Sequence, residues 1–159
     1  MLGRMKTAKW IGLVFLVAVA AVLWFSSSGR KPIMHDLMIK GDGREAHFQV
    51  ELAENWTDLQ HGLMERKELP DNAGMLFYFG GERSVSMWMK DTLVPLDMLF
   101  IAKDGGIIDI AANRLPLSKE MVHSPAPVIA VLEIKGGIAR KLGIKTGDKV
   151  IYPPFLADK

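Results

Sequence analysis

The polar residues best placed to do chemistry lie in one short segment, from Trp88 to Asp97. Within it stand Lys90, Asp91 and Thr92, and Asp97 comes five positions after Thr92. A strand that ends at Lys-Asp-Thr and is followed by a proline-containing turn would bring Lys90 and both carboxylates to one sheet edge. Two carboxylates beside an ammonium group could carry out general acid–base chemistry, because such neighbours separate their pKa values.

The same residues also have a purely structural interpretation. Asp97 could accept hydrogen bonds from turn amides, and Lys90 could pair with an acid at the surface. Contacts of this kind are far more common than active sites, so the structural interpretation is favoured. No residue is assigned a catalytic role. The candidates for contact with a ligand or partner, which also include two residues that could form a buried ion pair, are Arg66, Trp88, Lys90, Asp91, Thr92, Asp97 and Glu133.

Methionine thioethers form a second candidate cluster. Met87 and Met89 flank Trp88, and along a strand they would share one face with Trp88 on the other. Clustered thioethers can hold Cu(I), but methionine is also a common filler of hydrophobic cores, which is the favoured interpretation. The other methionines that could lie nearby are Met64, Met75 and Met98.

Several other chemistries lack support in the sequence. The chain has no cysteine, which excludes disulfides, thiolate nucleophiles and zinc–thiolate sites. The histidines show no metal-ligand spacing, and neither a Gly-x-Ser-x-Gly elbow nor a phosphate-binding glycine loop is present. We therefore expect no cofactor and no metal site. The four histidines are His35, His47, His61 and His123.

The net charge of +2 comes from the first part of the chain. Residues 1–30 carry four Lys and Arg side chains and no acid, whereas residues 31–159 carry 16 Lys and Arg against 18 Asp and Glu. The globular part is therefore slightly acidic. A nucleic-acid partner is not expected.

An apolar run near the N-terminus predicts a single membrane-spanning helix. Trp10 to Phe25 contains no charged residue, and basic residues precede it. By the positive-inside rule, residues 1–9 would then be cytoplasmic, residues 10–28 would cross the lipid bilayer, and residues 29–34 would be a tether. Residues 35–159 would form a globular domain in the periplasm, held at the inner membrane.

A cleaved signal peptide is the alternative to an anchor, because Ala18-Val19-Ala20 resembles a cleavage triplet. That triplet lies in the middle of the apolar run, and bulky residues (Leu23, Trp24 and Phe25) end the run. Retention as an anchor is therefore favoured.

Short apolar stretches alternate with turn signals from His35 onward, which is typical of an all-β sandwich or barrel. A hairpin turn is expected at residues 103–106 (Lys-Asp-Gly-Gly). The expected strands are Asp36–Ile39, Ala46–Leu52, Gly74–Phe79, Ser86–Met89, Met98–Ala102, Ile107–Ala112, Val128–Ile134 and Lys149–Tyr152.

Two helices interrupt this pattern, one main and one short. Asn55 can cap the main helix, which is expected to fade by Lys67 and to present one face made of Trp56, Leu59, Leu63 and possibly Gln60. The short helix, Ile138–Leu142, is expected to end at Gly143 in a left-handed cap. In the turn that follows, Leu142 and Ile144 should be buried, and Asp148 should accept amide hydrogen bonds.

The stretch Asn113–Pro127 is long and punctuated by prolines. A loop of this length usually covers a cleft or meets a partner. It could equally pack across the open end of a sandwich. Both interpretations remain open.

Three blocks of the sequence resemble the domain of unknown function 192 family (DUF192). They are HGLMERKELPDNAGMLFYF, MWMKDTLVPLDMLFI and LEIKGGIARKLGIKTGDKV, in that order, and the resemblance covers about residues 35–153. The resemblance implies a small β-sandwich or distorted barrel with one prominent helix, and no particular reaction. Two positions depart from the family pattern: Asp91, where Asn is more usual, and Met87, where an aromatic residue is more usual.

Three functional hypotheses follow. The leading one is a non-catalytic interaction module, anchored in the membrane as an accessory subunit of a membrane-protein complex. The second is a small-molecule or carbohydrate binder that uses Trp88 as a stacking platform; it requires a concave pocket around Trp88. The third is a hydrolase-like enzyme that uses Lys90, Asp91 and Asp97, whose side chains must then converge on a cleft.

Overall fold

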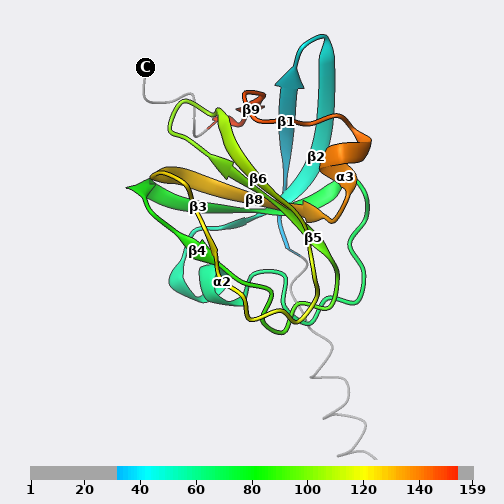
Figure 1. Ribbon diagram of the computed structural model, residues 1–159, viewed down its shortest axis with the longest axis vertical. Helices are drawn as coiled ribbons and strands as arrows, with labels where there is room; N and C mark the ends of the chain where they lie inside the picture. The colour runs from blue at the N-terminus through cyan, green and yellow to red at the C-terminus, as the bar shows by residue number, and fades with distance from the viewer. Residues whose placement is uncertain (1–31, 154–159) are drawn as a thin grey trace, which may run out of the picture. The chain divides into compact units, whose positions relative to one another are not determined.

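The computed structural model describes residues 32–153, whose main element is one curled, mainly antiparallel sheet (Figure 1). Its seven strands have the order β6-β5-β8-β3-β2-β1-β9, and a separate two-stranded sheet pairs β4 with β7. Only β2 and β3 are parallel. The strands are β1 Met34–Gly41, β2 Arg44–Ala53, β3 Ala73–Arg83, β4 Ser86–Met87, β5 Leu96–Ile101, β6 Ile107–Arg114, β7 Val122–His123, β8 Val128–Lys135 and β9 Lys149–Ile151.

The expected mainly β fold is confirmed, and each of the eight expected strands is present with ends that differ by a few residues. The sequence did not predict β7, which lies inside the stretch expected to be a loop, Asn113–Pro127. It forms because Val122 and His123 pair with β4, opposite Met87 and Ser86 respectively. Part of that stretch therefore belongs to the two-stranded antiparallel sheet that β4 and β7 form.

The sheet curls until its last strand reaches the hairpin that joins β5 to β6. The amide of Val150 in β9 donates to the carbonyl of Gly105, and the amide of Ile107 donates to the carbonyl of Asp148, at 2.8 and 2.9 Å. The expected hairpin turn at residues 103–106 thus also closes one end of the sheet. This closure makes the sheet a half-barrel.

Strands β5 and β8 are apolar along almost their whole length because both faces of the sheet are covered at its centre. Every residue of β5 is buried, as is every residue of β8 except Lys135. One face packs in a cluster with β1, β9 and α3 (Ile138–Lys141). The other packs in a second cluster with the segments that follow α2 (Trp56–His61) and β4.

Helix α2 begins as expected and ends earlier. Asn55 caps it, since its side-chain oxygen accepts the amide of Asp58 at 3.0 Å. The helix stops at His61 because Gly62 takes a backbone conformation (φ 53°, ψ −133°) that only glycine adopts readily. Trp56 and Leu63, expected on one face of the helix, differ in exposure: the Trp56 side chain is 75% exposed, whereas Leu63, which follows the helix, is buried.

The short helix α3 and the turn after it mostly follow expectation. Gly143 has the left-handed conformation of a C-terminal cap (φ 69°), and Ile144 is buried. Leu142, expected to be buried, is 40% exposed because it is the last residue before the cap and faces outward.

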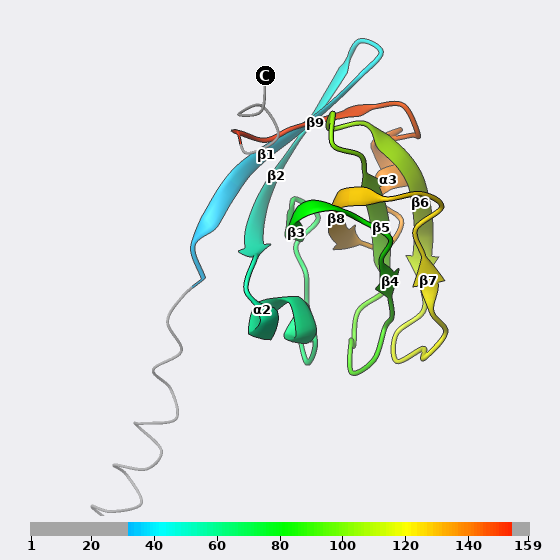
Figure 2. The same ribbon diagram turned by 90° about the vertical axis from the view of Figure 1, so that its left-hand side faces the viewer.

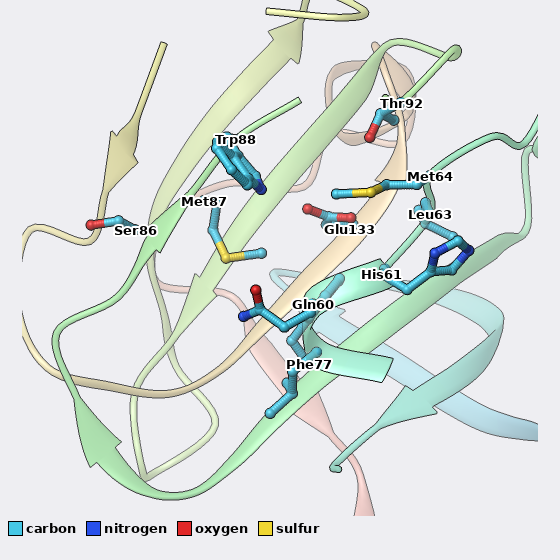
Figure 3. Close-up of a pocket in the computed structure, with 12 residues that line it drawn as sticks. Gln60, His61, Leu63, Met64, Phe77, Ser86, Met87, Trp88, Thr92 and Glu133 are labelled. Atoms are coloured by element: carbon cyan, nitrogen blue, oxygen red, sulfur yellow. The ribbon is translucent and has the colours of Figure 1, made fainter. Parts of the chain in front are cut away.

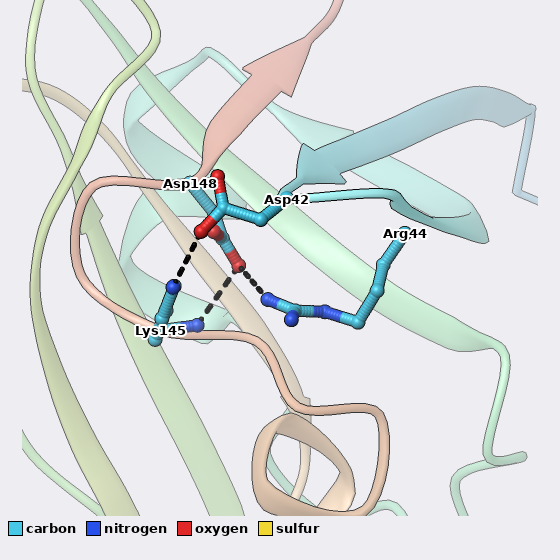
Figure 4. Close-up of polar contacts among 4 residues, drawn as sticks. All are labelled: Asp42, Arg44, Lys145 and Asp148. Carbon is cyan, nitrogen blue, oxygen red and sulfur yellow. Dashed lines mark hydrogen bonds and ion pairs between the residues drawn. The ribbon is translucent and has the colours of Figure 1, made fainter.

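Asp148 organises the corner between α3 and β9 (Figure 4). Its carboxylate accepts the Lys145 amide at 3.0 Å, as the sequence predicted, and also pairs with Arg44 at 3.4 Å. The Lys145 side chain turns to Asp42 at 2.8 Å. This corner links the β1–β2 hairpin to the turn that precedes β9.

The expected anchor, residues 10–28, and the expected cytoplasmic segment, residues 1–9, lie outside the described residues. Within residues 32–153, no helix has both the length and the apolar character that a membrane crossing requires. Strand β1 begins at Met34, inside the segment expected to be a tether.

Candidate functional site

A pocket of about 90 Å³ opens between the end of α2, β4 and the central strands of the sheet (Figure 3). A cavity of this size has room for several water molecules or one small organic group. The lining residues come from four separate parts of the chain: Leu59, Gln60, His61, Gly62, Leu63 and Met64 around the end of α2, Phe77 on β3, Ser86, Met87, Trp88 and Thr92 on and after β4, and Glu133 on β8.

The sheet register places Glu133 at the base of this pocket. On β8, Glu133 is directly opposite Met75 of β3 and Met98 of β5. Directly opposite residues share a face of a sheet, so these two thioethers flank Glu133 on the pocket side. The next residue of β8, Ile134, points to the other face together with its partner on β5, Asp97.

Glu133 is a buried carboxyl group without a partner. Its residue is 4% exposed, and within residues 32–153 no hydrogen bond or ion pair is formed by its side chain. Burial raises the pKa of the Glu133 carboxyl to about 8, because a charged carboxylate is poorly solvated there. A buried polar group that is left unsatisfied costs stability and requires an explanation.

Aromatic and thioether groups form the walls around Glu133. Figure 3 shows Trp88 and Met87 on one side of the carboxyl and Met64 on the other. Trp88 is 41% exposed, so it lies at the rim of the pocket. The expected strand alternation fails here because β4 ends at Met87: Met87 and Trp88 both line the pocket, whereas Met89 is buried in the core.

Three other residues of the predicted segment stand at or near the rim. Thr92 is buried, lines the pocket and donates its hydroxyl proton to the Lys90 carbonyl at 3.2 Å. Lys90 lies over the Trp88 ring, 5.6 Å from its centre, and pairs with Asp91 at 3.2 Å. Lys90 and Asp91 therefore form the surface pair that the structural interpretation anticipated.

Asp97 does not reach the pocket. Its carboxylate is fully buried on the opposite face of the sheet, where it accepts the amides of Asn113, Gly137 and Ala139 at 2.7, 3.0 and 2.9 Å. Asp97 therefore fixes the start of α3 against β5 and β6. The convergence that an acid–base pair of Asp91 and Asp97 would require is absent.

Arg66 also has a different partner from the one considered for it. Its guanidinium forms a two-pronged ion pair with Glu51 of β2, with a distance of 2.6 Å between Nη2 and Oε2. It does not pair with Glu133. Arg66 instead holds the segment after α2, which carries Leu63 and Met64, against the sheet.

Strained backbone gathers at one rim of the pocket. Glu65, Asp91 and Leu117 all have positive φ angles (62°, 53° and 61°), which are uncommon for residues other than glycine. The Glu65 amide donates to the Asp91 carbonyl at 2.8 Å, and the Leu117 amide donates to the Thr92 carbonyl at 3.0 Å. Three loops are thus tied together, and Figure 2 shows α2 and the loop before β7 at the same end of the domain.

Ser86 and His123 form a cross-strand pair that the sequence analysis did not anticipate. They are directly opposite in the β4–β7 sheet, with 2.7 Å between Ser86 Oγ and His123 Nδ1. Figure 3 shows the Ser86 side chain directed away from Glu133. The pair therefore serves to hold β7 onto β4 at the outside of the pocket.

The structure brings together Trp88, Thr92 and Glu133 from the predicted set and leaves Arg66 and Asp97 elsewhere. Sequence analysis missed Gln60 and His61 as lining residues. Their only signal was their position at the end of a capped helix, immediately before a glycine. Nothing in the sequence indicated that this helix end would face β8.

Known proteins resemble this chain in sequence and in structure. A sequence model of the family DUF192, described as an uncharacterized ACR, matches residues 37–152. A crystal structure of a protein from Sinorhizobium meliloti 1021, described there as a "putative transcription regulator", is 39% identical with a TM-score of 0.75, and the match covers 77% of this chain and 97% of that one. A protein of unknown function from Novosphingobium aromaticivorans DSM 12444 is 38% identical with a TM-score of 0.73, and the match covers 75% and 85% of the two chains. No curated protein matches.

Proposed function

The chain belongs to the DUF192 family, and we propose that its β domain is a small-molecule binding module whose ligand enters the Trp88–Glu133 pocket. One observation carries the proposal: Glu133 is 4% exposed, is unpartnered within residues 32–153, and opens into a cavity. A ligand that hydrogen-bonds to this carboxyl would offset the cost of its burial.

The surroundings of Glu133 support a binding role. Trp88 supplies a large, half-exposed aromatic wall that a ligand can cover, and Thr92 supplies a hydroxyl group. Backbone strain at Glu65, Asp91 and Leu117 costs of order 1–3 kcal/mol per residue and is typical of ligand clamps and functional loops. The strained loops lie at the rim, where a ligand would contact them.

The slightly acidic globular part argues against nucleic acid as the ligand. Residues 31–159 carry 16 basic against 18 acidic side chains, so they have no excess of positive charge to attract phosphates. The description of the Sinorhizobium meliloti relative as a transcription regulator is therefore not extended to this chain.

An NMR titration tests the proposal. Full-length protein in detergent micelles, labelled with ¹⁵N, is titrated with a library of small fragments that includes cations, anions and neutral molecules. We expect at least one fragment to shift the indole signal of Trp88 and the amides of Gly62, Met64 and Thr92. The indole of Trp56, exposed on α2 and outside the pocket lining, is the internal control.

Replacement of each tryptophan in turn provides matched variants. Trp88→Ala should weaken the binding of any fragment found, whereas Trp56→Ala should leave it unchanged. If no fragment perturbs the pocket signals, or if the shifts cluster away from it, the binding proposal fails.

An interaction module is the second candidate, and exposed leucines favour it. Leu93, Leu115 and Leu117 are 43%, 68% and 57% exposed on the two loops beside the pocket rim. We propose that these loops dock on a membrane protein as part of a complex. Extraction of the tagged full-length protein in mild detergent, followed by mass spectrometry, should recover a stoichiometric partner that Leu115→Ser/Leu117→Ser loses. Recovery of a lone monomer would contradict this role.

We also propose that residues 10–28 anchor the chain in the inner membrane, with residues 35–159 in the periplasm. The basic N-terminus and the apolar run support this topology. A C-terminal fusion to a reporter that is active only in the periplasm should be active and should remain in the membrane fraction. An active but fully soluble fusion would favour the cleaved signal peptide.

A further inference from the structure

We propose that the ligand of this pocket is a small organic cation with N–H donors, an alkylammonium group bound by the Glu133 carboxylate. The inference rests on the proposed binding function and adds the chemical class of the ligand. It is drawn from the charges, the hydrogen-bonding capacity and the size of the pocket lining.

Charge is the first argument. Glu133 is the only acid among the twelve lining residues, and the lining contains neither Lys nor Arg. His61 is the only other titratable side chain there. An anionic ligand would therefore find no countercharge in the lining, and Lys90 at the rim is paired with Asp91, whereas a cation would form an ion pair with Glu133 in surroundings of low dielectric constant.

Hydrogen-bonding capacity is the second argument. The two oxygens of Glu133 accept no hydrogen bond from residues 32–153, and Thr92 has already used its proton on the Lys90 carbonyl, which leaves its oxygen able to accept. Met64 and Met87 add weakly accepting, polarisable sulfur atoms around the carboxyl. An ammonium group has three N–H donors and no acceptor, which complements these acceptors.

The aromatic wall and the size of the pocket are the third argument. Trp88 lines the pocket, and an aromatic ring attracts a cation; the Lys90 ammonium, 5.6 Å from the ring centre, is itself paired with Asp91. The cavity of about 90 Å³ admits a short alkylammonium group or the amine end of a longer molecule. A multivalent metal ion would require more anionic ligands: within residues 32–153 no group of three His, Asp or Glu side chains could hold one.

Binding of a cation to Glu133 requires the carboxylate, so it is linked to the release of a proton. In the free protein, burial raises the pKa of Glu133 to about 8. As the pH is raised towards 8, the affinity for a positively charged ammonium probe should therefore increase about tenfold per pH unit, and above pH 8 it should level off. The other titratable or charged groups that face the pocket or its rim are His61 from α2 and the Lys90–Asp91 pair after β4.

The test compares n-butylammonium with its neutral counterpart 1-butanol. Each is titrated into ¹⁵N-labelled full-length protein in nonionic micelles at pH 6, 7 and 8, with the Trp88 indole signal as the readout and Trp56 as the internal control. We expect butylammonium to bind at least tenfold more tightly than butanol at pH 8 and about tenfold more weakly at pH 6 than at pH 7.

Glu133→Gln, which keeps the shape of the protonated side chain, should weaken butylammonium binding at least tenfold at pH 8. Glu82→Gln, an exposed substitution on β3, should not.

The outcomes separate the two proposals. Equal binding of butanol and butylammonium, or binding that is independent of pH in the wild-type protein, would overturn the cation while leaving a ligand pocket in place. Absence of any Trp88 response to butylammonium would also overturn it. The binding function itself fails only if, in addition, every fragment of the wider library leaves the pocket signals unchanged.

Discussion

Asp97 and Glu133 are buried carboxyl groups on neighbouring strands, β5 and β8, and their surroundings are opposite in kind. Asp97 receives three backbone amide hydrogen bonds from the loop before α3, from α3 itself and from β6. Glu133 receives none within residues 32–153, and a cavity lies in front of it. The two lie on different faces of the sheet, because Asp97 pairs with Ile134 and Met98 pairs with Glu133 in the register.

This difference separates a structural role from a binding role. Three amides occupy the carboxylate oxygens of Asp97 and fix the position of α3, so nothing is left for a ligand to bind. Glu133 has unused acceptors beside open space, so its burial becomes favourable only with a partner. Burial alone does not distinguish a structural carboxyl group from a ligand-binding one, because both residues are buried. The number of hydrogen-bond donors around each carboxyl group does.

Removal of the charge at Asp97 should have the largest effect on stability. In Asp97→Asn, one amide acceptor replaces a carboxylate that serves three donors, and its NH₂ group would face N–H groups. We expect a loss of at least about 3 kcal/mol in the free energy of unfolding. Urea denaturation measures it, with Asp109→Asn on β6 as the control because no polar contact of that side chain is present within residues 32–153. A loss below 1 kcal/mol would show that the amides find other acceptors.

Replacement of Glu133 should alter how stability depends on pH. Burial raises the pKa of Glu133 from 4.5 to about 8, so the folded protein holds this proton more tightly than the unfolded chain does. The resulting contribution to the free energy of unfolding is complete below pH 4.5 and is lost progressively as the pH rises to about 8. In Glu133→Gln this dependence disappears. Between pH 4 and pH 7, the variant should therefore gain about 3 kcal/mol relative to the wild-type protein, from about 1.4 kcal/mol per pH unit.

Urea denaturation across pH 4–9 checks this expectation. The exposed substitution Glu82→Gln should follow the wild-type curve throughout. Parallel curves for wild-type protein and Glu133→Gln would mean that Glu133 is solvated or paired in solution, and the contrast with Asp97 would disappear.

Two glycines allow the backbone of the two regions to be compared. In Gly62→Ala, at the pocket, the added Cβ would lie 2.9 Å from the Phe77 ring, in a conformation that already disfavours other residues. In Gly137→Ala, next to the Asp97 amides, the left-handed φ of 85° is disfavoured but the space is open. We expect losses of about 2–3 and about 1 kcal/mol in the free energy of unfolding, respectively. Thermal unfolding measures both, and the reverse order would contradict the close packing of Gly62 on Phe77.

The smallest effect should come from the ion pair that supports the pocket from outside. Arg66 and Glu51 have side chains that are 33% and 12% exposed, so solvent screens part of their attraction. Arg66→Gln should cost about 1 kcal/mol or less in urea denaturation. Because Arg66 holds the segment that carries Met64, the variant should still shift the Met64 amide signal. An unshifted signal would mean that this segment is fixed by other contacts.

The sequence predicted the strands better than the contacts of the helices. Short apolar stretches bounded by turn residues located every strand that belongs to the large sheet, because both signals are local patterns in the sequence. Leu142 was expected to be buried and is exposed, and Trp56 does not share the burial of Leu63, because the sequence pattern does not say which side of a short helix meets the sheet. Strand β7 was missed because its two residues form a strand only through pairing with β4.

For the candidate site, the sequence identified Trp88, Thr92 and Glu133 but placed them in one set with Arg66 and Asp97. The structural alternative for Asp97, acceptance of backbone amides, proved to be its role, although the donors come from two distant segments, the end of β6 and the start of α3. Arg66 was considered as a partner of Glu133 and pairs with Glu51. Residue type shows which groups can pair, and only their positions in the sheet show which ones do.

By itself, therefore, the sequence determined the family, the β class, the positions of most strands and turns, and the residue types from which a site could be built. These depend on local periodicity, on glycine and proline, and on blocks of residues that are contiguous in the chain. The register of β5 against β8 decided the rest: it turned Asp97 towards α3 and Glu133 towards a cavity. A shift of one residue would exchange the faces of the two strands, and only the packing of the whole sheet fixes that choice.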